Sequence, residues 1–272
     1  MTRPTVKPDR ILRRPSRWWW LAGAVLLCGV AAGVAWEVLG GPKTRLPELM
    51  LRSEDPSRRK WGAWETTSDQ GFAYIADRLA EGSEAVADVR EAFVYTLGQH
   101  EQARYFDLVA DLALADPSGY VRQAAWLAAA RIDPHRFTAW VAAASPGAAP
   151  WDELGRANGC LEAGDVSGVP VLFRWAREGD TDQQRVAFRA LYTRLMPLLV
   201  AAGRWPADVV LGEIEPWPAA LLDEVERRCA TLDLQSIADD TRPHLAAAQL
   251  VTRNTRRVTS AREWIATVLW WF

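Results

Sequence analysis

The chain has 272 residues, of which 49% are apolar and 24% are charged, with a formal net charge of −2. This composition excludes an intrinsically disordered chain, and the near-zero net charge argues against non-specific binding of nucleic acid, which depends on an excess of basic side chains. Three cysteines are too few for a disulfide scaffold. Arginine greatly outnumbers lysine and alanine is abundant, which is typical of a protein from a GC-rich bacterial genome.

The first 17 residues form a basic arm. They carry six arginine or lysine side chains and a single acidic one, Asp9, and prolines at positions 4, 8 and 15 interrupt any helix. We expect this arm to be extended and solvated. The rest of the chain, residues 43–272, is mildly acidic by contrast.

A stretch of 19 residues without a charge, Trp18–Trp36, follows the arm. As a helix it is ~28 Å long, close to the ~30 Å hydrocarbon core of a bilayer, and tryptophans at both ends suit the membrane interface. The sequence therefore predicts a transmembrane helix over residues 18–39. A cleaved signal peptide is the alternative, since Gly33-Val34-Ala35 resembles a cleavage site. The apolar stretch is longer than such peptides usually have, which favours an uncleaved anchor.

The orientation of this anchor follows from the basic residues near its two ends. Six precede it, whereas only Lys43, Arg45 and Arg52 follow within about fifteen residues. This asymmetry places the N-terminus in the cytoplasm. We therefore expect a single-pass protein of the bacterial inner membrane with its main domain in the periplasm.

The main domain is predicted to be all-α. Residues 40–65 contain Pro42, Pro47 and Pro56 and lack sustained periodicity, so we interpret them as a linker or cap. From residue 66 to 252, amphipathic helical patterns alternate with breaks rich in Gly, Pro and Asp, and no run of alternating β-branched residues indicates a strand. Helical patterns interrupted every fifteen to thirty residues favour helical hairpins, which calls for a search for an internal repeat.

An arginine motif recurs along these helices. Arg90 in DVREA is followed 32 residues later by Arg122 in YVRQA, and weaker copies centre on Arg156 and Arg185, a further 34 and 29 residues on. An amphipathic helix precedes each copy, with apolar residues spaced by three and four. A single thirty-residue hairpin cannot bury its apolar face alone, so we expect stacked hairpins to share one continuous core.

At these residues the chain resembles the HEAT-like repeats of the phycobilisome-lyase type. The most similar segments are residues 115–133 and 165–191, and the second has Pro170 early in its first helix and an acidic turn at Gly179-Asp180. The resemblance covers about residues 71–195. It implies an α-solenoid in which the acidic turn residue and the arginine tie neighbouring repeats, and it implies no bilin-lyase activity. Helical patterns beyond residue 206 are interpreted as divergent or capping repeats.

Residues 253–272 form a predicted amphipathic helix at the C-terminus. It is rich in aromatic residues, including Trp264, Trp270 and Trp271, and basic residues lie just upstream. At ~20 Å the final thirteen residues are too short to cross a bilayer. Two interpretations stay open: the helix lies on a membrane surface or docks on a partner, or it packs on the last repeat.

No motif in the sequence indicates catalysis. His100, His135 and His244 have no metal-ligand spacing, and a nucleophile elbow, a phosphate-binding glycine loop and a dinucleotide fingerprint are all absent. Cys160 and Cys229 are able to pair in an oxidising compartment, but spacing alone does not place them within reach. We expect no enzyme activity, no metal and no cofactor.

The function expected from these patterns is protein binding by a membrane-anchored scaffold or accessory subunit. Trp126, Trp140 and Trp175 on the repeat helices, together with the C-terminal tryptophans, are candidate contacts with a partner or membrane, although tryptophans in a helical array also fill space between helices. Two alternatives remain: an enzyme or ligand-binding protein that uses a cleft between the helices, and a membrane signalling module whose cytoplasmic arm carries the output.

Overall fold

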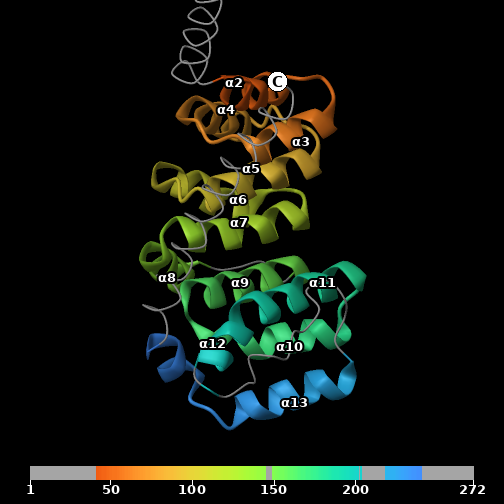
Figure 1. Ribbon diagram of the computed structural model, residues 1–272, viewed down its shortest axis with the longest axis vertical. Coiled ribbons are helices and arrows are strands. Elements are labelled where there is room, and N and C mark those ends of the chain that lie inside the picture. Colours follow the sequence, from red (N-terminus) through yellow and green to blue (C-terminus); the bar gives the residue numbers. More distant parts are fainter. Residues whose placement is uncertain (1–40, 145–148, 202, 204–217, 241–272) are drawn as a thin grey trace, which may run out of the picture.

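A computed structural model describes residues 41–144, 149–201, 203 and 218–240. These residues form an all-helical fold without strands, and the helices follow one another along the long axis of the molecule (Figure 1). In chain order they are α2 (Gly41–Leu51), α3 (Pro56–Glu65), α4 (Asp69–Ala80), α5 (Ala87–Gln99), α6 (Phe106–Ala115), α7 (Gly119–Ile132), α8 (Pro134–Ala143), α9 (Pro150–Ala163), α10 (Val169–Glu178), α11 (Thr181–Ala190), α12 (Met196–Ala201) and α13 (Ala219–Ala230).

The helices pack as successive pairs: α2 with α3, α4 with α5, α6 with α7, α8 with α9, and α10 with α11. We call the second member of each pair the inner row. It consists of α3, α5, α7, α9 and α11, and each of these helices contacts the next. The first members, α2, α4, α6, α8 and α10, form the outer row. The chain therefore builds two adjacent rows of helices.

Residues 41–65 are not an irregular linker, because they fold as the first helix pair. Asp55 caps α3 by accepting a hydrogen bond from the backbone N–H of Ser57 (2.9 Å), and Pro56 occupies the first helical position, where its missing N–H costs nothing. The Thr96 hydroxyl on α5 donates to the carbonyl of Ala63 (3.0 Å). Apolar periodicity is weak here because the buried face of α3 consists of small residues, Gly62 and Ala63.

Elsewhere the helices follow their amphipathic patterns. In α10 the buried side chains recur at spacings of three, one and three residues, namely Val169, Leu172, Phe173 and Ala176. The next helix, α11, begins at a capping box in which Asp180 accepts hydrogen bonds from backbone N–H groups of the first turn and Gln183 accepts one from the Asp180 N–H. These local signals fix where each hairpin turns.

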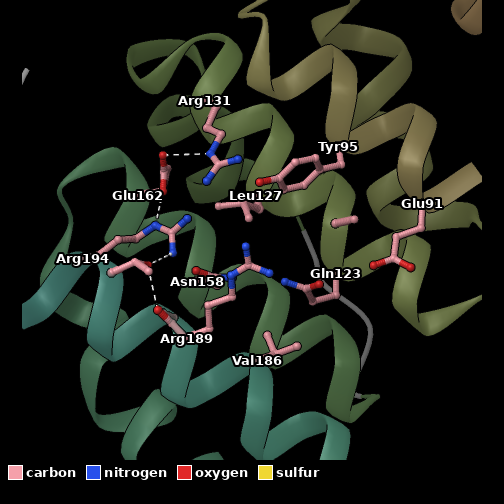
Figure 2. A pocket seen from close by; sticks show the side chains of 13 residues that line it. Glu91, Tyr95, Gln123, Leu127, Arg131, Asn158, Glu162, Val186, Arg189 and Arg194 are labelled. Atoms are coloured by element: carbon pink, nitrogen blue, oxygen red, sulfur yellow. Dashed lines mark hydrogen bonds and ion pairs between the residues drawn. The ribbon is translucent and has the colours of Figure 1, made fainter. Parts of the chain in front are cut away.

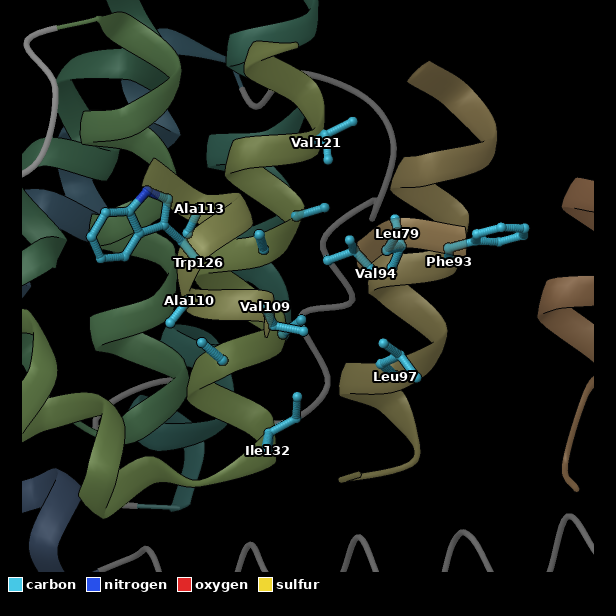
Figure 3. Packing of buried hydrophobic residues seen from close by; sticks show 14 of the residues in the cluster. Leu79, Phe93, Val94, Leu97, Val109, Ala110, Ala113, Val121, Trp126 and Ile132 are labelled. Atoms are coloured by element: carbon cyan, nitrogen blue, oxygen red, sulfur yellow. The ribbon is translucent and has the colours of Figure 1, made fainter. Parts of the chain in front are cut away.

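The buried apolar residues form two clusters and not the single core that the repeat predicted. The first extends from Leu51 to Cys160 and includes Phe93, Val94 and Trp126 (Figure 3). The second extends from Leu154 to Ala238. Helix α9 contributes to both, since Cys160 belongs to the first cluster and its other buried apolar side chains belong to the second.

Glycines allow the closest contacts between inner helices. A Cβ atom on Gly98 of α5 would lie 2.6 Å from the Cα and Cβ atoms of Ala128 on α7, and one on Gly155 of α9 would lie 2.8 Å from the Trp126 ring. Real Cβ atoms do not approach other atoms this closely. The spacing of α5, α7 and α9 therefore depends on the absence of side chains at these two positions.

Three predicted segments lie outside the described residues: the basic arm, residues 1–17, the transmembrane segment, residues 18–39, and the C-terminal helix, residues 253–272 with Trp264, Trp270 and Trp271. Within the part of the chain that the structure describes, no helix is long and apolar enough to traverse a bilayer.

Candidate functional site

Three arginines on the inner row form a repeated bridge between neighbouring helix pairs. Arg59, Arg90 and Arg122 are each the fourth residue of their helix, in α3, α5 and α7. Each guanidinium binds a buried carboxylate from the following pair: Arg59 Nε lies 2.8 Å from Glu84, Arg90 Nε 2.8 Å from Asp116, and Arg122 Nε 2.5 Å from Asp152. We call this series the arginine ladder.

The same guanidinium groups also hold the turn that precedes their own helix. In each case Nη1 donates to the two carbonyl groups five and six residues earlier, which for Arg90 are those of Ala85 (2.9 Å) and Glu84 (3.1 Å). Arg59 and Arg122 repeat this geometry. Each arginine therefore fastens its own hairpin turn and the next helix pair together.

Protonation at the ladder is governed by competition between burial and charge. Burial by itself would raise the pKa of the Glu84 carboxyl, but hydrogen bonds from Arg59 and the Val86 N–H, with the charges of Arg59 and Arg78, hold that pKa below its ordinary value. The hydrogen bond to Asp116 raises the pKa of Arg90. Glu84 and Arg90 therefore keep their charges near neutral pH.

The ladder includes two of the four predicted repeat arginines. Arg90 and Arg122 belong to it, whereas Arg156 is the seventh residue of α9 and is exposed, and Arg185 is the fifth of α11 and pairs with Asp182 in its own helix (2.7 Å). The fourth residue of α9 is Glu153, which binds Arg174 and the Trp175 indole instead. Arg59 was missed, although it precedes Arg90 by 31 residues, nearly the repeat spacing.

A pocket of about 290 Å³ opens on the inner row, and only residues of α5, α7, α9, α11 and the π-helical segment η3 (Leu191–Leu195) line it (Figure 2). Its charged lining residues are three arginines and two glutamates: Arg131, Arg189, Arg194, Glu91 and Glu162. The amides of Gln123 and Asn158 and the ring of Tyr95 complete its polar surface.

One carboxylate at the pocket is shared between two arginines. Glu162 accepts from Arg131 (3.0 Å) and from Arg194 (Figure 2). Burial would raise the pKa of Glu162, but these two positive charges hold it below its ordinary value. Arg194 reaches Glu162 from η3, where a wider helical turn replaces the α-helical one, and such turns often occur at functional sites. Glu162 therefore stays ionised.

A second hollow, of about 340 Å³, adjoins this pocket toward α3 and is lined by Lys60, Trp64, Ala92, Gln99 and three residues that both hollows share. Glu91 and Arg189 are among the shared residues. Burial raises the pKa of Glu91, while the charge of Lys60 opposes this rise. The two hollows form one inner face that extends from α3 to α11, and charged side chains line both of them.

Three of the six tryptophans predicted as contacts lie among the described residues, and one of these three, Trp126, lies in the core. Trp126 is fully buried, with its ring centroid 4.5 Å from that of Trp140, so it is not available to a partner. Trp140 and Trp175 are half-buried, and the Trp175 indole donates to Glu153 (3.2 Å). Among the described residues, the exposed tryptophans are Trp61 and Trp64 on α3, in the segment interpreted from the sequence as a linker or cap.

The described residues hold no constellation typical of metal or thiol chemistry. No group of three or more His, Cys, Asp or Glu side chains among them is placed to bind a metal ion. Cys160 and Cys229 are unpaired and lie in different apolar clusters, and burial raises the pKa of each thiol to about 11. These thiols are weak nucleophiles near neutral pH because they carry little thiolate.

Comparison of the chain with protein-family models, with curated proteins and with solved structures finds no significant match.

Proposed function

We propose that this protein is a membrane-anchored scaffold, an α-solenoid of HEAT-like hairpins that binds a partner protein along its inner row. The inner face carries this proposal. Successive helices α3, α5, α7, α9 and α11 contribute side chains to it, and it presents exposed Trp64 next to charged groups. An elongated surface of this kind suits an extended partner segment.

The arginine ladder supports the solenoid part of the proposal. The HEAT-like resemblance implies that an acidic turn residue and an arginine tie neighbouring repeats, and Arg90 with Asp116 has that arrangement. The interaction recurs at Arg59 and Arg122, so the same tie joins four consecutive helix pairs. A repeated tie keeps the inner row in register and therefore keeps its surface continuous.

Exposed apolar side chains at the first helix pair support the membrane attachment. Six large hydrophobic residues are exposed in the described part of the chain, and, apart from Trp64 of the inner face, three of them lie on α2 and α3: Leu46, Leu49 and Trp61. The predicted apolar span ends at Trp36, five residues before α2 begins. A surface held this close to a bilayer tolerates apolar and tryptophan side chains, because lipid can cover them.

Site-specific photocrosslinking tests the proposed partner binding. A photoreactive amino acid would replace Trp64 or Gln99 on the inner face, or Asp111 on the exposed outer side of α6, in the full-length chain in its own membranes. We expect one discrete cross-linked protein from both inner positions and none from position 111. Equal cross-linking from all three positions, or none from the inner ones, would contradict the proposal.

The proposed orientation is tested separately with intact spheroplasts. Added protease should digest the helical body in the periplasm and leave a short fragment that contains residues 1–39. A body that is protected until the membrane is broken would overturn the periplasmic location.

A further inference from the structure

One acceptor in the pocket has no partner within the described part of the chain. Asn158, on α9, is only 3% exposed, and its Oδ1 atom is buried without a hydrogen bond. Buried polar atoms are nearly always satisfied, and leaving one unpaired costs about 1–3 kcal/mol. Because this side chain lines the pocket, a donor brought by a ligand could satisfy it.

One donor group in the same pocket also lacks a partner. Arg189 is exposed on α11, and its guanidinium makes no hydrogen bond or ion pair with the described residues. Figure 2 shows this side chain pointing into the pocket toward Asn158 and Gln123. Arg131 and Arg194, in contrast, both bind Glu162. The free cation and the free acceptor therefore face the same space.

The charges of the pocket select the type of ligand. Glu162 neutralises only one of the two arginines that bind it, and Arg189 adds a further positive charge. The pocket thus favours an anion, but Glu91 on the opposite helix opposes a dianion such as phosphate. A guanidinium group binds a carboxylate through two parallel hydrogen bonds, so one free arginine matches one carboxylate.

We infer that this pocket binds the carboxylate of an acidic residue in a partner polypeptide, with Arg189 as the donor to that carboxylate and Asn158 Oδ1 as the acceptor of a backbone N–H beside it. The inference rests on the proposed scaffold function and names the chemistry that the inner face recognises. A volume of about 290 Å³ accommodates a side chain and its adjacent peptide group, not a folded domain.

Saturation-transfer NMR on the full-length chain in detergent tests this inference with short peptides. The probes are acetyl-Gly-Glu-Gly-amide, the matched acetyl-Gly-Gln-Gly-amide, and free glutamate. We expect the glutamyl peptide to bind at least about tenfold more tightly than the glutaminyl peptide, because it alone forms charge-assisted hydrogen bonds with Arg189. Equal binding of the two peptides overturns the inference, and so does binding of free glutamate alone.

Variants then assign the interaction to the pocket. Arg189→Gln should weaken binding of the glutamyl peptide about tenfold, whereas Arg185→Gln, four residues earlier on the same helix, should leave it unchanged because Arg185 pairs with Asp182. Glu91→Gln should tighten binding, since it removes a competing carboxylate from the pocket. Unchanged binding in Arg189→Gln, or weaker binding in Glu91→Gln, overturns the inference.

The two proposals fail in different ways. If the peptide comparison fails while cross-links from positions 64 and 99 persist, the inner face still binds a protein and the assigned pocket chemistry is wrong. If the cross-links are also absent, the scaffold proposal fails as well. The comparison of the two peptides on the unmodified chain needs no substitution, so it remains decisive even if a variant folds poorly.

Discussion

The two halves of the helix stack, which meet at α9, are held together by different polar interactions. From α3 to α9 the arginine ladder repeats one buried ion pair between successive helix pairs. In α9 itself the ladder position holds Glu153, and beyond α9 Arg177 of α10 binds the exposed carboxylates of Asp223 and Glu226 on α13. The repeat is therefore strict in the first half and divergent in the second.

This difference identifies α9 as the place where the regular array ends. Asp152 of α9 still accepts the last rung from Arg122, while Glu153, the next residue, binds Arg174 of α10. The inner-face pocket also lies across α9. The regular half holds its helices in a fixed register. Where the pattern changes beside it, a polar side chain such as Arg189 has no ion-pair partner among the described residues.

Breaking one rung should have the largest effect on stability. Arg90→Met keeps much of the apolar stem but leaves Asp116, whose side chain is 3% exposed, without its partner. Loss of one member of a buried pair costs about 3–5 kcal/mol, so the melting temperature followed by circular dichroism should fall by roughly 10 °C.

The matched control lies in the second half. Arg177→Met removes an arginine that is 35% exposed and whose partners are more exposed still. Surface pairs contribute about 0–1 kcal/mol, so this variant should melt within a few degrees of the parent chain. Similar decreases in melting temperature for Arg90→Met and Arg177→Met would refute the proposed difference between the two halves.

A smaller effect is expected where the inner helices approach each other most closely. Alanine usually stabilises a helix interior relative to glycine, but a Cβ atom at position 98 would lie 2.6 Å from atoms of Ala128. Gly98→Ala should therefore destabilise the chain by about 1–3 kcal/mol through overpacking. Thermal unfolding checks this expectation, and a variant more stable than the parent would show that α5 and α7 can separate without cost.

Acid should weaken the first half through Glu84. The folded-state pKa of Glu84 lies below its ordinary value, so its contribution to stability is present above about pH 4.5 and is lost as the pH falls through the folded pKa. Glu84→Gln should be less stable than the parent at pH 7, and the difference between the two melting temperatures should shrink below pH 4.5.

The corresponding group in the second half is Glu224. Hydrogen bonds from Arg227 and Arg228 lower its pKa too, but it is on the surface. Salt screens exposed charges much more than buried ones. Added salt should therefore abolish the pH dependence of stability that comes from Glu224 and preserve the pH dependence that comes from Glu84. If salt reduces the two pH dependences equally, the Glu84 carboxylate is more accessible to solvent than its contacts imply.

Sequence alone predicted the all-helical fold because amphipathic spacing and breaks at Gly, Pro and Asp are local signals. The spacing of Arg90 and Arg122 also indicated the repeat. The first helix pair was missed because Gly62 and Ala63 bury little apolar area, so α3 has no clear periodic face. The division of the core was not predictable, since it depends on which faces of α9 meet α7 and α11.

The inner-face pocket could not be predicted from the sequence for a similar reason. Its residues come from four helices and the π-helical segment, and no short motif connects Asn158 with Arg189. Tryptophan content also proved a poor guide to exposure, because Trp126 fills space between helices while Trp61 and Trp64 face outward. The exposure of a tryptophan depends on tertiary packing, which cannot be inferred from the number of aromatic residues.

The smallest effect is expected at Arg185, the motif arginine of the second half. Its sequence signal is a weak repeat match, and its guanidinium binds Asp182 three residues away on the surface of α11. Such pairs contribute about 0.2–0.5 kcal/mol, so Arg185→Met should change the melting temperature by less than about 2 °C. A loss comparable to that of Arg90→Met would show that Arg185 ties neighbouring helix pairs after all, and the ladder would then continue past α9.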